Sequence, residues 1–213
     1  MVIPKGTTHE FWQTIHAGAK AAADDMNTEI LWKGPQKEDD RQQQIELVQN
    51  AIALGVDGIV LAPLDARALV GPVEQAVERG IPVVIIDSAL NSDQPVSYVA
   101  TDNYNGGALA ARRLGELMQG QGRAILLRYA VGSASTEQRE QGFLDTMQSE
   151  FPEITFVSND QYAGATAATA LEKSQQLVTR YRGQVDGIFA PNESSTFGML
   201  RALEGAGMLE GNR

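Results

Sequence analysis

Aromatic, acidic, basic and amide side chains follow the ends of several predicted strands in this chain. They are Lys5, His9, Phe11, Trp12, Asp87, Tyr162 and Asn192, together with Arg139 on the helix predicted after the strand 123–128. The C–H faces of a sugar ring stack on aromatic rings, and each hydroxyl both donates and accepts hydrogen bonds, so carboxylates and guanidinium groups bind it well. In open α/β sheets, ligands lie beyond the carboxyl ends of the strands. The pattern therefore indicates a site suited to a sugar.

Most of these residues also have a plain structural interpretation. His9 could be a polar residue at a helix start, Asp87 a turn residue and Arg139 a solvated helix residue. Phe11 and Trp12 are adjacent, so they cannot both face one core, and we expect one of them to face the ligand cleft. We expect Asp65, Asp102 and Asn103 to be structural, the last two as hinge and helix cap.

No recognisable catalytic or metal-binding pattern is present. The sequence contains no GxGxxG after a strand, no GxxxxGK[ST] loop and no GxSxG elbow. It has 0 cysteines, and His9 and His16 lack a third metal ligand at a suitable spacing. Glu10 and Asp87 are the only candidates for a hydrolytic carboxylate pair. We expect a binding protein without cofactor or metal, and not an enzyme.

Composition and charge restrict the function classes further. The chain has 213 residues, 43% of them hydrophobic, and a formal net charge of -10. Such an acidic surface argues against non-specific nucleic-acid binding, which needs a Lys/Arg footprint. No apolar run approaches the roughly 20 residues that span a bilayer. The lack of cysteine is compatible with an oxidising compartment.

Apolar strand-like runs alternate with runs of helical spacing almost throughout, which predicts βαβ units with parallel sheets. The predicted strands are 1–4, 29–32, 56–62, 82–86, 96–101, 123–128, 154–158 and 185–190. The predicted helices are 11–26, 45–54, 66–79, 103–119, 135–149, 165–181 and 194–206. Gly55 is expected to end the helix before it.

Two similar lobes are predicted, because the segment 56–63 is echoed by 185–191. We expect an N-terminal sugar-binding lobe over 1–101 and a C-terminal lobe over 102–213, each a Rossmann-like three-layer αβα unit. In the first lobe a strand follows Asp57 by some 25 residues, and the same offset from Asp186 falls at about residue 211. We therefore expect the chain to be C-terminally truncated and the fragment to bind ligand poorly.

The combination of these segments resembles the ribose-binding-like, sugar-binding periplasmic proteins of ABC transporters, which are type I periplasmic binding proteins and share their fold with lac-repressor-type cores. The resemblance rests on the pair Phe11-Trp12, Ile86-Asp87 and the pair Gly106-Gly107. It also rests on these motifs: GVDGI at 55–59, GIPVV at 80–84, ATDN at 100–103, REQGF at 139–143, VDGI at 185–188, APNE at 190–193 and GMLRAL at 198–203.

The resemblance implies that Phe11, Trp12 and Tyr162 supply stacking surface, and that Asp87, Arg139 and Asn192 bind hydroxyls. His9 stands where ribose binders have Asn, Ala62 replaces an Asn, and Ser88 replaces an Arg. Lys5 is a polar candidate that the ribose pattern lacks. These departures leave the fold intact but put ribose itself in doubt.

By the same resemblance, the protein is a solute-binding protein that captures a pentose, hexose or polyol between two lobes by hinge closure and delivers it to a membrane permease. It is expected to be periplasmic or lipid-anchored outside the cytoplasm, and monomeric. The first alternative is the effector-binding core of a lac-repressor-type regulator, which a DNA-binding headpiece should precede. The second is an enzyme, either a nucleotide-dependent oxidoreductase or a glycosidase.

Overall fold

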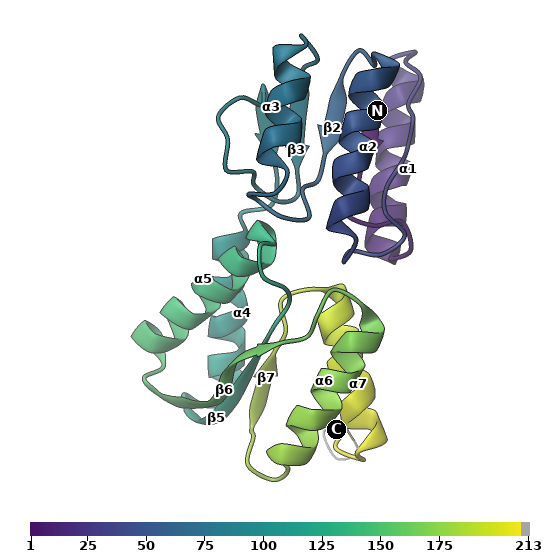
Figure 1. The fold of residues 1–213 in the computed structure, drawn as a ribbon. Helices are drawn as coiled ribbons and strands as arrows, with labels where there is room; N and C mark the ends of the chain where they lie inside the picture. The colour runs from purple at the N-terminus through teal and green to yellow at the C-terminus, as the bar shows by residue number, and fades with distance from the viewer. Residues whose placement is uncertain (210–213) are drawn as a thin grey trace. The chain divides into compact units, whose positions relative to one another are not determined.

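The computed structural model describes residues 1–209, in which α-helices alternate with parallel β-strands (Figure 1). The chain divides into two compact units. Unit 1 comprises Met1–Ala100 and the short segment Gly132–Ala134, and the remainder forms unit 2. The first change of unit, at Ala100, lies one residue from the boundary predicted at 101. No sequence pattern predicts the return of Gly132–Ala134 to unit 1.

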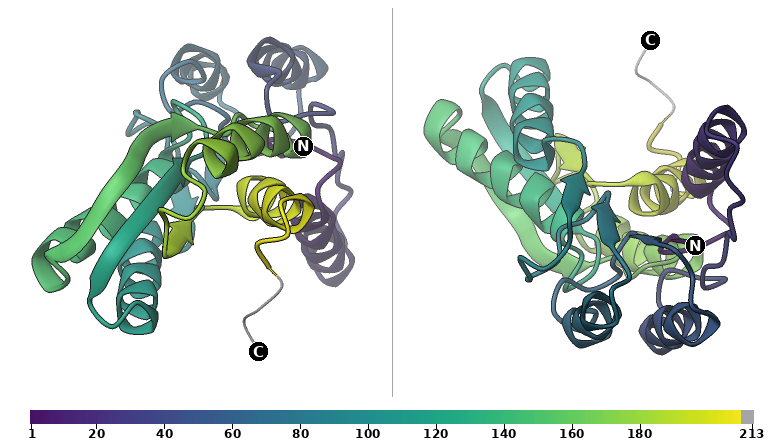
Figure 2. Two further views of the ribbon diagram at one scale, coloured as in Figure 1. Left: turned by 90° about the horizontal axis from the view of Figure 1, so that it is seen from below. Right: turned by 90° about the horizontal axis from the view of Figure 1, so that it is seen from above.

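Unit 1 is built on a four-stranded parallel sheet in the order β1-β2-β3-β4. Its strands are β1 (Val2–Ile3), β2 (Ile59–Leu61), β3 (Val83–Ile86) and β4 (Ser97–Val99), and its helices are α1 (Glu10–Asp25), α2 (Arg41–Leu54) and α3 (Val70–Glu78). Apolar side chains of β1, β2 and β3 pack with those of α2 and α3 in one buried core. In the views of Figure 2, α2 and α3 lie on one side of the strands and α1 on the other.

Unit 2 contains a three-stranded parallel sheet in the order β6-β5-β7. Its strands are β5 (Gln121–Arg128), β6 (Glu153–Tyr162) and β7 (Gly187–Phe189), and its helices are α4 (Asn103–Leu117), α5 (Ala134–Glu150), α6 (Ala167–Arg180) and α7 (Glu193–Gly205). One core joins the sheet to α4 and α5, and a second joins it to α6 and α7. The two cores make this unit a three-layer αβα sandwich, and the predicted α/β class with parallel sheets is confirmed.

Side chains at the ends of the helices satisfy backbone groups that the helices leave unpaired. The Asp102 carboxylate accepts a hydrogen bond from the Asn105 amide at 3.0 Å, which confirms it as the N-cap of α4. Gly55 ends α2 with a φ of 64°, a left-handed conformation that glycine adopts without a steric penalty. The caps predicted from the sequence at Asp102 and Gly55 therefore coincide with the observed ends of α4 and α2.

The crossing of α4 and α5 depends on two glycines. A Cβ atom on Gly107 would overlap the backbone carbonyl of Arg139, and one on Gly142 would overlap the backbone of Tyr104. A Cβ on Gly106 would meet nothing within 4 Å. Of the pair Gly106-Gly107, only Gly107 is therefore required by the close approach of the two backbones.

Several element boundaries differ from the predictions. No strand forms over 29–32, where only an isolated bridge joins Trp32 to Val2. The helix predicted from residue 66 begins at Val70, after a turn. Strand β6 continues to Tyr162 through irregular register with β5. The strand expected at about residue 211 lies outside the described residues.

Candidate functional site

In unit 1, the residues after β1 and β3 meet at the carboxyl edge of the sheet. Lys5 follows β1 and is 3% exposed. Its Nζ atom lies 2.9 Å from Asp87 Oδ2 and donates to Ser88 Oγ at 2.6 Å. Both β1 and β3 run parallel to β2, so their carboxyl ends lie at the same edge. The structure therefore brings together two of the predicted binding residues, Lys5 and Asp87.

The backbone at Asp87 helps to aim its carboxylate. Asp87 has a φ of 62°, and left-handed conformations are uncommon for residues other than glycine, asparagine and aspartate. The Asp87 amide donates to the Val99 carbonyl at 3.1 Å, and the Ser88 amide donates to the Ile86 carbonyl at 2.7 Å. Burial and the Asp87 charge together raise the pKa of Tyr98 on β4. The backbone turn at Asp87 and the ion pair with Lys5 together determine the position of the Asp87 carboxylate.

The aromatic pair at the start of α1 is split between core and surface. Trp12 is 2% exposed, whereas Phe11 is 43% exposed. The rings meet edge to face, with centroids 4.9 Å apart and planes at 79°. One aromatic of the pair therefore remains accessible, as the adjacency of the two residues indicates. Their stacking against a sugar stays a prediction.

Glu38 links His9 to Trp12, and the sequence gives little sign of it. Its Oε1 atom accepts a hydrogen bond of 2.5 Å from the Trp12 indole Nε1–H and lies 3.0 Å from His9 Nδ1. Glu38 belongs to the acidic run Glu38-Asp39-Asp40, which on composition alone resembles a solvated surface. Glu38 lies 26 residues after Trp12 in the sequence, and only the fold brings its carboxylate to the residues that follow β1.

In unit 2, Arg139 is held by two hydrogen bonds. Its Nε atom donates to Asn103 Oδ1 at 2.8 Å and its Nη1 atom to the Pro191 carbonyl at 2.9 Å. Asn103 is 1% exposed, and its Nδ2 atom has no hydrogen-bond partner among the described residues. Asn103 is the first residue of α4 and also orients Arg139. No sequence pattern predicts this second role.

Asn192 and Tyr162 occupy the ends of β7 and β6. The Asn192 side chain caps α7, since its Oδ1 atom accepts from the Ser195 amide at 3.3 Å. Tyr162 is 40% exposed, and the Arg128 guanidinium lies 6.0 Å from its ring centroid. Pro191, whose carbonyl accepts from Arg139, directly precedes Asn192 in the chain. Tyr162 instead lies beside Arg128, its register partner on β5.

A second buried carboxylate, Glu140, follows Arg139 in α5. It is 0% exposed, and it accepts from the Tyr129 amide at 2.9 Å and from Arg128 Nη1 at 3.0 Å. Burial raises the pKa of Glu140, and these two donors oppose the increase. Glu140 therefore ties the start of α5 to the carboxyl end of β5.

The strand ends in the described part of the chain offer mainly hydrogen-bonding groups. Within residues 1–209 no group of three or more His, Asp or Glu side chains could hold a metal ion. The described helices include none that is long and apolar enough to cross a membrane. Polar groups at strand ends, with an accessible aromatic ring, can bind hydroxyls and a ring face.

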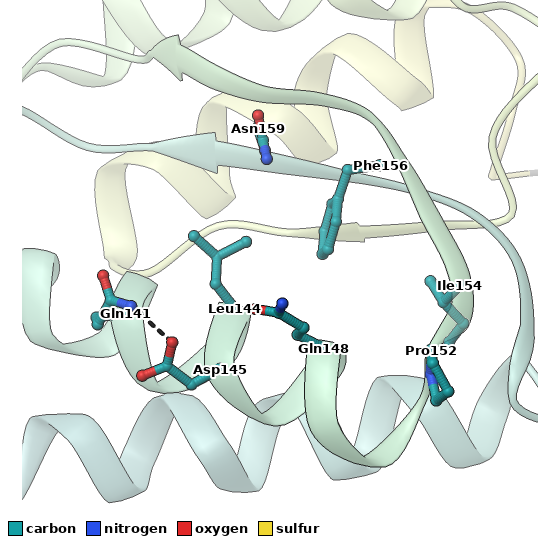
Figure 3. A pocket seen from close by; sticks show the side chains of 8 residues that line it. All are labelled: Gln141, Leu144, Asp145, Gln148, Pro152, Ile154, Phe156 and Asn159. Carbon is teal, nitrogen blue, oxygen red and sulfur yellow. Dashed lines mark hydrogen bonds between the residues drawn. The ribbon is translucent and has the colours of Figure 1, made fainter.

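A groove of about 430 Å³ lies beside α5 and β6. Figure 3 shows its lining, in which Gln141 donates to Asp145 at 2.7 Å next to Leu144 and Phe156. None of the eight predicted binding residues contributes to it. We assign it no role in ligand binding.

Parallel α/β units with polar and aromatic side chains at their strand ends define a ligand-binding class of protein. The chain belongs to the periplasmic binding protein domain family, whose model matches residues 1–212. The resemblance derived from the motifs is thereby confirmed.

The relatives carry sugar-related names. A xylitol-binding protein of Mycolicibacterium smegmatis is 27% identical over 181 residues, which cover 85% of this chain and 51% of the relative. A D-ribose/D-allose-binding protein of Pseudomonas aeruginosa is 27% identical over 218 residues, which cover 97% of this chain and 66% of that protein. The chain thus spans about half to two thirds of the length of these relatives.

Solved structures show the same fold. The crystal structure of an ABC transporter solute-binding protein from Agrobacterium vitis with bound D-fucose has a TM-score of 0.92 and 35% sequence identity. The match covers 97% of this chain and 72% of that protein. The similarity therefore extends over nearly all of the present chain.

Proposed function

We propose that this chain is part of a solute-binding protein of an ABC transporter, which captures a sugar or polyol outside the cytoplasm and delivers it to a membrane permease. The protein acts as a monomer and does not catalyse a reaction. The names of the relatives and the bound sugar in the Agrobacterium vitis protein support this proposal.

The observation that carries the proposal is the ion pair of Lys5 and Asp87 at the carboxyl edge of the unit 1 sheet. A hydroxyl that approaches this pair can donate to the carboxylate and accept from the ammonium group, and hydrogen bonds to charged partners are stronger than neutral ones. Considered by itself, unit 2 presents the charged donor Arg139, whose orientation Asn103 and Pro191 fix. A neutral polyol satisfies both kinds of group.

The test is titration calorimetry of the complete protein against xylitol, D-ribose, D-allose, D-fucose and D-arabinose. Wild-type protein is expected to bind at least one of them, and Asp87→Asn to bind it at least about tenfold more weakly, the loss of one hydrogen bond to a charged group. Asp93→Asn is the matched control, because Asp93 is exposed. Binding of none of these compounds by the wild type would contradict the proposal.

A further inference from the structure

The carboxylate of Glu38 is buried within the group of residues that follows β1. Its side chain is 8% exposed and contacts both His9 Nδ1 and Trp12 Nε1 through one oxygen atom. The loop packs closely on it, since a Cβ added at Gly6 would lie 3.0 Å from Glu38 Cγ. Removing a carboxylate from water is costly unless partners compensate. Glu38 is therefore held in place by the two side chains that it contacts.

The neighbouring acids in the same run have different environments. Asp40 is exposed and caps α2 by accepting from the Gln43 amide at 2.9 Å. Asp39 is exposed as well. Only Glu38 of the three contacts predicted sugar-binding residues. The run is thus not a uniform solvated surface, and Asp39 provides a matched control for removal of a negative charge.

The contact with Glu38 fixes which nitrogen of His9 carries a proton. A carboxylate only accepts hydrogen bonds, so the Nδ1 atom that faces it must be the donor. In the neutral ring the Nε2 atom is then the acceptor. The same carboxylate fixes the rotation of the Trp12 indole about its side-chain bonds, because the short hydrogen bond defines where Nε1 points.

We infer that Glu38 is a positioning residue of the sugar site, which sets the His9 tautomer and the Trp12 ring orientation. The affinity part of this inference rests on the proposed function. The positioning part concerns the protein alone and can be measured without ligand.

The first experiment is NMR of the ¹⁵N-labelled chain at one fixed pH. The sequence has 2 His and 2 Trp, so each signal can be assigned by difference. His16 and Trp32 stack on each other, with ring centroids 4.4 Å apart, and serve as internal references. Glu38→Gln is expected to move the Trp12 indole N–H and His9 ring ¹⁵N signals and to leave those of His16 and Trp32 unchanged. Asp39→Asn should move none of the four.

The second experiment is calorimetry of the complete protein with a sugar that the wild type binds. Glu38→Gln is expected to weaken binding by about tenfold, and Asp39→Asn by less than twofold. If Glu38→Gln does not fold, Glu38→Asp retains the charge but withdraws the oxygen by one methylene, and the same two signals should move.

The outcomes separate the two proposals. Unchanged Trp12 and His9 signals in the Glu38 variants would overturn the positioning role, whether or not affinity falls. Moved signals with wild-type affinity would overturn the role in the site. A wild-type protein that binds no sugar would instead contradict the proposed function and with it the affinity part, while the NMR result would still decide the positioning part.

Discussion

The ion pair of Lys5 and Asp87 holds two charges nearly out of solvent, with side-chain exposures of 4% and 14%. Buried pairs of this kind are sensitive to the loss of one partner, because the other charge remains desolvated. The Lys5 ammonium also donates to Ser88, which is fully buried. The pair therefore affects stability as well as ligand chemistry.

Replacing Lys5 by methionine is expected to lower the free energy of unfolding by about 3 kcal/mol, since Asp87 is left without its cation. Adding Asp87→Asn should recover much of this loss, and urea denaturation of the single and double variants measures the coupling. Lys20→Met, at an exposed position of α1, is the control. A double variant no more stable than Lys5→Met would contradict the explanation.

Glu140 makes stability depend on pH in the opposite sense to a typical surface carboxylate. Burial raises its pKa above the ordinary 4.5, despite the opposing hydrogen bond from Tyr129 and the charge of Arg128. As the pH rises from the unfolded to the raised folded pKa, the unfolded carboxyl loses its proton first. The folded state then binds more protons than the unfolded state, so the free energy of unfolding falls over this window.

Glu140→Gln is expected to remove this fall, because glutamine does not titrate. The difference in free energy of unfolding between wild type and variant should therefore change with pH above about 4.5. Urea denaturation across this range provides the measurement. A constant difference for Glu140→Gln would show that its pKa is not raised.

The rule that ligands lie at strand ends selected Lys5 and Asp87 from the sequence, because residues that follow parallel strands must share an edge. Arg139 was selected from the helix that follows such a strand. Glu38 and the link from Asn103 to Arg139 could not be selected in this way. Glu38 follows no strand, and its contact with Trp12 spans 26 residues. Asn103 meets Arg139 only because α4 and α5 cross closely, and no local pattern specifies that crossing.

At the scale of elements, helical spacing and uninterrupted apolar runs predicted every described helix and most strands. The failures have local causes. Asp65 accepts from the Arg67 and Ala68 amides at 2.9 Å each, and the residues after it form a turn in place of helix. Near Trp32 only one bridge to Val2 forms, so the short apolar run over 30–32 is not sufficient for a strand.

The crossing of α4 and α5 gives a prediction with its own control. Gly107→Ala is expected to lower the free energy of unfolding by about 3 kcal/mol, because the methyl group would overlap the Arg139 backbone. Gly106→Ala should be neutral or raise it by about 0.5–1 kcal/mol, since alanine favours the helix and the space is open. Chemical denaturation compares them. Equal stabilities would exclude a tight crossing at Gly107.

At the scale of the molecule, the two units have separate hydrophobic cores, one in unit 1 and two in unit 2. Alternating strands and helices predicted this class of fold, because such a pattern packs as a parallel sheet with helices on both faces. The internal echo of 56–63 at 185–191 corresponds to β2 and β7, which lie in different sheets. The repeat therefore indicates the presence of two units more directly than any single motif does.

Both tryptophans, Trp12 and Trp32, belong to unit 1. Intrinsic indole fluorescence consequently follows the melting of that half alone, whereas circular dichroism averages over the helices of both. Superimposable curves from the two probes would mean that the halves lose structure in one cooperative step, and displaced curves would reveal an intermediate in which one half persists without the other.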